Sequence, residues 1–224
     1  LLNLFSGAIA VVFAVKGALT IAALFVLLGI FFDFLDGFLA RKLKVESTLG
    51  LQLDSLADMV TSGLVPGLIM FQLLSLSISG SGHYMDLLPY TGLLITLGSA
   101  YRLANFNILV DQKNYFTGLP TPANALLILS FPMILEYQNS EAFNFIILNP
   151  WFLLAFTLTS TVLLNAPVKF ITLKFQTWKL SDNLEKYIFL ILSLVFLIIF
   201  KFFGIYLIIF SYVLLSLIKP PNDV

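Results

Sequence analysis

Four aspartates lie within apolar stretches of this sequence, where charged side chains are unexpected. Asp33 and Asp36 follow the apolar run ALTIAALFVLLGIFF (18–32), and Asp54 and Asp58 lie between apolar residues further along. A charged side chain costs at least about 2.5–3.5 kcal/mol at mid-bilayer, so carboxylates kept in such segments call for a function. An all-oxygen set without histidine or cysteine suits hard cations such as Mg²⁺, Mn²⁺ or Ca²⁺. We therefore interpret the four aspartates as a two-metal site.

The spacing of these residues places them on two helical stripes, since residues three, four or seven apart share a helix face. The first stripe consists of Asp33, Asp36, Gly37 and Ala40, and the second of Gly50, Asp54 and Asp58. The polar turn KVEST (44–48) joins the two helices, so we expect them to run antiparallel with their stripes facing each other. At about 1.5 Å per residue, Asp33 lies about 14 Å along its helix from Lys42, which places the pocket in one leaflet.

Small residues and one arginine accompany the first stripe. Gly37 and Ala40 leave room for a flat or phosphorylated group near the helix backbone, and Arg41 is always charged and suited to hold a phosphate. The alternative for the small residues is close helix packing. The alternative for Arg41 is a side chain that extends to the membrane interface.

The composition places the whole chain in a membrane. It has 224 residues, of which 59% are hydrophobic and 11% are charged, whereas soluble domains carry about 25% charge. We predict an all-α, polytopic membrane helical bundle of about eight transmembrane helices, forming one integral membrane domain over 1–224. The predicted helices span 1–16, 19–43, 48–75, 84–110, 122–137, 143–165, 185–200 and 203–218.

The distribution of charge predicts the orientation of the bundle. The formal net charge is zero, but ten of the twelve Lys and Arg residues lie on the side of the 41–48 hairpin, and Lys16 and Lys201 lie opposite. The positive-inside rule then places this hairpin and both termini in the cytoplasm. Because the chain starts with Leu1 and a short span, we expect the native protein to begin upstream.

The residues from 33 to 58 read D-x2-D-G-x2-A-R-x8-G-x3-D-x3-D. This pattern resembles the signature of the CDP-alcohol phosphatidyltransferases at all eight defined positions. The resemblance implies a homodimer with a six-helix core and two divalent cations, Mg²⁺ or Mn²⁺, on Asp33, Asp36, Asp54 and Asp58. It also implies that Asp58 is the general base. The CDP-lipid-binding residues implied by the resemblance are Asn3, Asp33, Gly37, Ala40, Arg41 and Gly50.

Three further stretches are similar to the phosphatidylserine synthase branch of this family. They are DSLADMVTSGLVPGLIMF (54–71), YRLANFN (101–107) and FTGLPTPANAL (116–126). The resemblance implies transfer of a phosphatidyl group from CDP-diacylglycerol to L-serine, with release of CMP. The implied partners are these two substrates, membrane lipid and a second copy of the chain, without nucleic acid. The implied location is the inner (cytoplasmic) membrane, multi-pass, with the active site facing the cytosol.

Serine as acceptor needs a site for its carboxylate. Arg102 is well placed for it, and Thr61 and Ser62 extend the face of Asp54 and Asp58 into the pocket. Alternatively, Arg102 extends to the membrane interface, and Thr61 and Ser62 form hydrogen bonds between helices. Asn105 departs from the pattern of the branch, in which a basic residue often occupies that position.

Other acceptors and another class of protein stay open from the sequence. Glycerol phosphate, inositol phosphate and choline are alternative acceptors; the phosphorylated ones would need several basic residues, and only Arg41, Arg102 and Lys113 are near the pocket. Carboxylates within membranes also serve cation transporters, although these often show inverted repeats that this sequence lacks. We expect no catalytic role for His83, and we interpret the basic segment 168–180 as an interfacial stretch.

Overall fold

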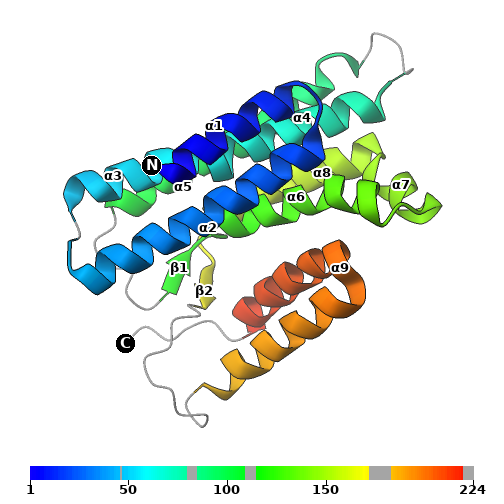
Figure 1. Ribbon diagram of the computed structural model, residues 1–224. Coiled ribbons are helices and arrows are strands. Elements are labelled where there is room, and N and C mark those ends of the chain that lie inside the picture. The colour runs from blue at the N-terminus through cyan, green and yellow to red at the C-terminus, as the bar shows by residue number, and fades with distance from the viewer. Residues whose placement is uncertain (46, 80–84, 109–114, 172–182, 219–224) are drawn as a thin grey trace.

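The computed structural model describes residues 1–45, 47–79, 85–108, 115–171 and 183–218, and most of them are helical (Figure 1). The N-terminal half contains α1 (Leu2–Val15), α2 (Leu19–Leu43), α3 (Thr48–Asp58), the π-helix η1 (Met59–Leu64), α4 (Val65–Ser77), the 3₁₀-helix η3 (Leu88–Leu93) and α5 (Leu94–Ile108). The C-terminal half contains β1 (Tyr115–Thr117), α6 (Thr121–Tyr137), α7 (Glu141–Ile147), α8 (Pro150–Asn165), β2 (Lys169–Ile171) and α9 (Leu184–Ile218).

The described residues include three helices that are long and apolar enough to cross a bilayer alone. They are Leu19–Leu43, Thr48–Ser77 and Lys186–Ser216, and the bent pair α7 and α8 adds a fourth candidate. The all-α membrane bundle is therefore confirmed. The number of such spans is lower than the predicted eight, because α1 has 14 residues, α5 has 15 and α6 has 17.

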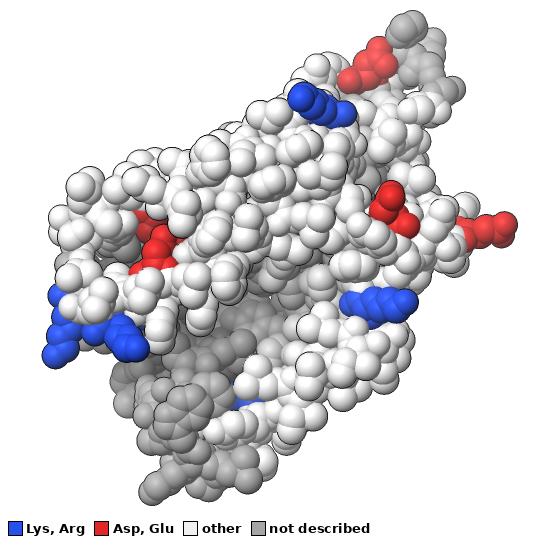
Figure 2. Space-filling view, viewed as in Figure 1, with Lys and Arg blue, Asp and Glu red and all other residues white. Residues whose placement is uncertain are grey.

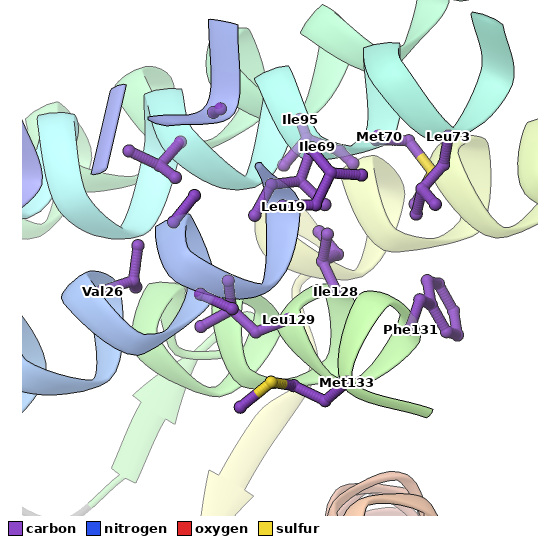
Figure 3. Packing of buried hydrophobic residues seen from close by; sticks show 14 of the residues in the cluster. Leu19, Val26, Ile69, Met70, Leu73, Ile95, Ile128, Leu129, Phe131 and Met133 are labelled. Atoms are coloured by element: carbon purple, nitrogen blue, oxygen red, sulfur yellow. The ribbon is translucent and has the colours of Figure 1, made fainter. Parts of the chain in front are cut away.

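The main core lies between α1, α2, α4 and α6, with α5 and α8 packed beside them. Figure 3 shows labelled side chains of α2, α4, α5 and α6 meeting in one cluster. The labelled residues of that cluster are Leu19, Val26, Ile69, Met70, Leu73, Ile95, Ile128, Leu129, Phe131 and Met133. Many of the apolar side chains outside the core are exposed, as expected for a protein whose solvent is lipid.

The predicted helix 48–75 is confirmed, but its middle is a π-helix. The wide turns of η1 (Met59–Leu64) coincide with Pro66, which has no N–H to donate to the helix ladder. They also coincide with a contact from α5, where the hydroxyl of Thr96 donates to the carbonyl of Gly63 at 3.2 Å. The sequence pattern did not predict this irregular segment, which directly follows Asp58.

Two other predicted helices differ from the structure. The helix predicted over 84–110 begins, within the described residues, as the 3₁₀-helix η3 and becomes α-helical at Leu94. The helix predicted over 143–165 is two helices, α7 and α8, at 60° to each other. The second of these starts at Pro150, which suits a first helical position.

The C-terminal helix α9 folds back on itself. Lys201 has φ 50° and ψ −123° and divides α9 into two antiparallel halves, as the predicted break between 200 and 203 anticipated (Figure 1). The hairpin contacts α6 and β2. Strand β2 pairs antiparallel with β1, from Tyr115 opposite Ile171 to Thr117 opposite Lys169. This small sheet was not predicted, because strands of three residues carry too little pattern.

Some sequence predictions fall outside the described residues. They concern His83, Lys113 and the part of the basic segment 168–180 that follows Ile171. The described beginning of that segment includes β2 (Lys169–Ile171), and the interpretation of 168–180 as an interfacial stretch stays a prediction.

Candidate active site

The turn between α2 and α3 consists of a cap at the end of α2 and a cap at the start of α3. Lys44 adopts a left-handed conformation with φ 55°, and the N–H groups of Lys44 and Val45 donate to the carbonyls of Arg41 and Ala40. This pattern ends an α-helix. Ser47 then caps α3 by accepting a hydrogen bond from the Gly50 N–H at 3.0 Å. The two caps reverse the chain, so that α3 returns toward the aspartates of α2.

The reversal brings together three of the four aspartates. Asp33, Asp36 and Asp54 each offer a carboxylate oxygen, and these oxygens lie within 4.8 Å of one another. Oxygen ligands of one Mg²⁺ or Ca²⁺ lie about 2.0–2.6 Å from the ion, so their separations reach about 5 Å at most. The three carboxylates therefore fit a divalent cation. Figure 2 shows acidic atoms in a recess of this surface, beside basic atoms where α2 ends.

Asp58 lies next to this group but is not a member of the cluster. Its Oδ1 accepts a hydrogen bond from Asn3 Nδ2 at 3.1 Å, and Asp33 Oδ1 accepts from the same nitrogen at 3.3 Å. Asn3 comes from the first turn of α1, and its side chain is only 1% exposed. The two aspartate stripes are thus linked by an amide from a third helix.

The other residues predicted to hold the CDP-lipid surround the end of α2. The guanidinium of Arg41 folds back over Gly37, because a Cβ added at Gly37 would lie 3.6 Å from Arg41 Nη1. Ala40 lies between them in sequence and is half-buried. Gly50 lies in the first turn of α3, where a Cβ would stand 3.1 Å from Ser47 Oγ, so packing against the helix cap also favours a glycine there. Their roles toward a nucleotide stay predictions.

Arg102 is buried close to Asp58. Its side chain is 8% exposed, and its Nε has no hydrogen-bond partner among the described residues. The guanidinium interacts electrostatically with the carboxylate of Asp58 and with the phenol of Tyr212. An arginine at the membrane interface would be exposed to water. The burial of Arg102 therefore contradicts the alternative that its side chain extends to the interface.

Thr61 and Ser62 are both completely buried in the π-helix. Thr61 donates its hydroxyl to the backbone carbonyl of Asn3 at 3.3 Å, and its side chain fills the space beside Gly7 and Gly29. This position favours a helix-packing role for Thr61. The hydroxyl of Ser62 has no partner among the described residues. Acceptor binding by either residue stays a prediction.

Two features of the site were not predicted. The bridge from Asn3 to the aspartates was missed, although an asparagine within an apolar helix is a visible signal. Tyr212 was also missed, since nothing distinguishes it from the other aromatic residues of α9. Tyr212 stacks on the buried ring of Phe170 at 5.6 Å between centroids. Because Tyr212 also interacts with Arg102, the C-terminal hairpin reaches the edge of the site.

Comparison with known proteins gives a family match over most of the chain. The family model described as CDP-alcohol phosphatidyltransferase matches residues 1–163. This range includes every residue of the site except Tyr212.

Several curated relatives are similar to this chain. An archaetidylserine synthase of Methanothermobacter thermautotrophicus is 34% identical over 144 residues, which cover 63% of this chain and 59% of the relative. A CDP-diacylglycerol–serine O-phosphatidyltransferase of Bacillus subtilis is 37% identical over 116 residues, which cover 49% of this chain and 60% of the relative. One of the same name from Helicobacter pylori is 28% identical over 218 residues, covering 92% and 84%. The chain thus spans about six tenths of the first two relatives.

Proposed function

Because this chain belongs to the CDP-alcohol phosphatidyltransferase family, we propose that it transfers a phosphatidyl group from CDP-diacylglycerol to L-serine and releases CMP. Both the donor and the acceptor are supported by the names of the Bacillus and Helicobacter relatives. The observation that carries the proposal is the arrangement of three clustered carboxylates beside Asp58, with the buried Arg102 close enough to interact electrostatically with Asp58.

In the proposed reaction, Asp58 accepts the proton of the serine hydroxyl. The serine oxygen then forms a bond to the phosphorus of the phosphatidyl group, and the bond from that phosphorus to the oxygen of CMP breaks. Arg102 binds the serine carboxylate with paired hydrogen bonds, which its planar guanidinium is suited to make. Arg41 contacts the diphosphate from the end of α2.

The carboxylates of Asp33, Asp36, Asp54 and Asp58 would hold the divalent cations that the family resemblance implies. Bound cations supply positive charge that neutralises the diphosphate and the leaving CMP. Repulsion between three carboxylates this close also disfavours the ionised cluster without a cation. Metal dependence and the choice between Mg²⁺ and Mn²⁺ are therefore part of the proposal.

The proposal is tested by measuring CMP release from purified protein in micelles that contain CDP-diacylglycerol. We expect release to need serine, to stop with EDTA and to resume with Mg²⁺ or Mn²⁺. Asp58→Asn should lower turnover at least about a hundredfold, the lower range for general-base catalysis. Glu141→Gln is the matched control, because Glu141 is an exposed carboxylate at the start of α7.

An acceptor panel separates serine from the alternatives. Activity with glycerol phosphate, inositol phosphate or choline, but none with serine, would refute the acceptor and keep the family chemistry. Ion flux in liposomes without CMP release would instead favour a cation transporter.

Orientation and assembly also belong to the proposal. The exposed Arg41, Lys42 and Lys44 at the end of α2 support a cytosolic pocket in the inner membrane by the positive-inside rule. The family resemblance supports a homodimer. Labelling of a cysteine introduced at Lys44 in sealed vesicles tests the first, and cross-linking in the membrane tests the second.

A further inference from the structure

The C-terminal hairpin brings a tyrosine from the far end of the chain to the site. The ring of Tyr212 stacks on Phe170 of β2, with 5.6 Å between the ring centroids and 24° between the ring planes. The ring of Phe189, in the first half of α9, lies 6.1 Å from that of Tyr212. Phe170 is completely buried. Two aromatic neighbours from different segments therefore fix the position of the Tyr212 ring.

Strand β2 is in turn attached to the end of α8. Phe170 is opposite Phe116 in the antiparallel pair of β1 and β2. Shortly after β1, the N–H of Leu119 donates to the carbonyl of Leu163, near the end of α8, at 2.9 Å. Figure 1 shows the two strands lying alongside the bundle, close to α9. This small sheet therefore connects the C-terminal hairpin to α8.

The end of α8 packs on the face of α5 that carries Arg102. The side-chain amide of Asn165 donates to the carbonyl of Gly98 at 3.0 Å, and a Cβ added at Gly98 would lie 3.1 Å from Thr161 Cγ2. Gly98 and Arg102 are four residues apart, so they share a face of α5. These contacts bring the end of α8, and the strands attached to it, to the side of α5 on which Arg102 lies.

Tyr212 is close enough to the guanidinium of Arg102 to interact with it. The guanidinium interacts electrostatically with Tyr212 as well as with Asp58. Arg102 is buried, and its Nε has no hydrogen-bond partner among the described residues. A guanidinium has five N–H donors and no acceptor, whereas a phenol oxygen accepts hydrogen bonds. A phenol can therefore orient the guanidinium and leave most of its N–H groups for another ligand.

We propose that Tyr212 is a positioning residue of the acceptor site, which holds the guanidinium of Arg102 in the orientation that binds the carboxylate of the acceptor alcohol. This inference rests on the proposed function. The family model covers residues 1–163, which include the four aspartates and Arg102, whereas Tyr212 lies beyond this range. The C-terminal hairpin thus adds selection of a carboxylate-bearing acceptor to a core that handles the CDP-linked donor.

A phenol suits this role better than a carboxylate would. A phenol is neutral at pH 7, so it orients the guanidinium without cancelling its positive charge. A carboxylate at position 212 would form a buried ion pair with Arg102 and would compete with the carboxylate of the acceptor. Without either group, the guanidinium would lose orientational freedom when the acceptor binds, which weakens binding.

The alternative is that Tyr212 only packs against Phe170 and Phe189. Tyr212→Phe separates the two roles, because it keeps the ring and removes only the hydroxyl. Tyr206→Phe is the matched control, since Tyr206 is on the same half of α9 and stacks on Phe203 with 5.9 Å between the ring centroids.

The experiment measures CMP release with serine and CDP-diacylglycerol, each varied in turn. It uses the unmodified protein, Tyr212→Phe, Arg102→Leu, the variant with both substitutions, and Tyr206→Phe. In Tyr212→Phe we expect KM for serine to rise at least about fivefold, while kcat and KM for CDP-diacylglycerol stay within about twofold. In protein that already carries Arg102→Leu, Tyr212→Phe should change kcat/KM for serine by less than about twofold, because its effect passes through Arg102. Tyr206→Phe should leave all three constants unchanged.

Three results would overturn the inference. An unchanged KM for serine in Tyr212→Phe would show that the hydroxyl has no part in acceptor binding. An equal fall in kcat/KM with and without Arg102 would show that Tyr212 acts independently of it. A joint change in kcat and in both KM values would indicate a packing role. If the unmodified protein releases no CMP with serine, the proposed function itself fails, so the two failures are distinguishable.

Discussion

Replacing Arg102 with leucine tests the acceptor most directly. The variant removes the positive charge and the hydrogen-bond donors, and leucine suits the apolar helix α5. The side chain of Arg102 is 8% exposed, so water contributes little to any pairing between its guanidinium and a bound carboxylate. Loss of one partner from a buried, hydrogen-bonded charge pair costs about 2–5 kcal/mol.

That cost predicts a large and selective change. At about 1.4 kcal/mol for each factor of ten, kcat/KM for serine should fall about 30- to 4,000-fold. Ethanolamine is serine without the carboxylate, so it loses no such contact. Arg102 also interacts with Asp58, and this effect acts on both acceptors alike. The ratio of kcat/KM for serine to that for ethanolamine therefore isolates the contact with the acceptor carboxylate.

The assay measures CMP release with each acceptor for the unmodified protein, Arg102→Leu, Arg102→Lys and Tyr101→Phe. Tyr101 is next to Arg102 on α5 but is 63% exposed, so Tyr101→Phe should keep the ratio. Arg102→Lys should give an intermediate ratio, because lysine keeps the charge and loses the planar pair of donors. An unchanged ratio in Arg102→Leu would show that Arg102 does not bind the serine carboxylate.

Three further predictions concern the cluster and two turns. Asp54→Asn should weaken Mn²⁺ binding at least about tenfold, measured by the loss of the electron paramagnetic resonance signal of free Mn²⁺. An Mn²⁺ affinity equal to that of the unmodified protein would exclude Asp54 as a ligand. Gly118→Ala should lower the melting temperature by about 4 °C or more, because Gly118 has φ +77° and its Cβ would collide with the carbonyl of Leu164; a melting temperature that does not fall would contradict this. Lys201→Gly should raise the melting temperature by about 2–4 °C, because glycine adopts φ 50° without strain; a lower value would show that the lysine side chain stabilises the turn.

The sequence was sufficient to predict the convergence of the two aspartate stripes. Helical spacing put Asp33 and Asp36 on one face, and the polar turn implied an antiparallel return that would bring Asp54 to them. The structure confirms this for those three residues. The break in α9 was also predicted, because the sequence indicated two separate helices, 185–200 and 203–218, on either side of Lys201.

The features that were missed depend on contacts between distant segments. Asp58 accepts a hydrogen bond from Asn3, which lies 55 residues away in the chain. The π-helix coincides with a hydrogen bond from a hydroxyl of α5 as well as with Pro66. The pairing of β1 with β2 joins three-residue strands on either side of α6, α7 and α8. Local periodicity carries no information about such partners, so these features could not be read from it.

The π-helix has a consequence for how this segment tolerates insertions and deletions. In η1 the backbone N–H of Val65 donates to Val60, five residues earlier, instead of four. A π-turn holds about one residue more than an α-turn, so the six residues of η1 turn the helix about as far as five residues of regular α-helix would. Losing one residue from 59–64 would therefore let the segment return to regular α-helix while Asp54 and Asp58 keep their direction relative to the side chains of α4. Losing a residue elsewhere in α3 or α4 would instead rotate one half against the other by about 100°, so η1 is the part of this helix where a change of length disturbs the direction of the aspartates least.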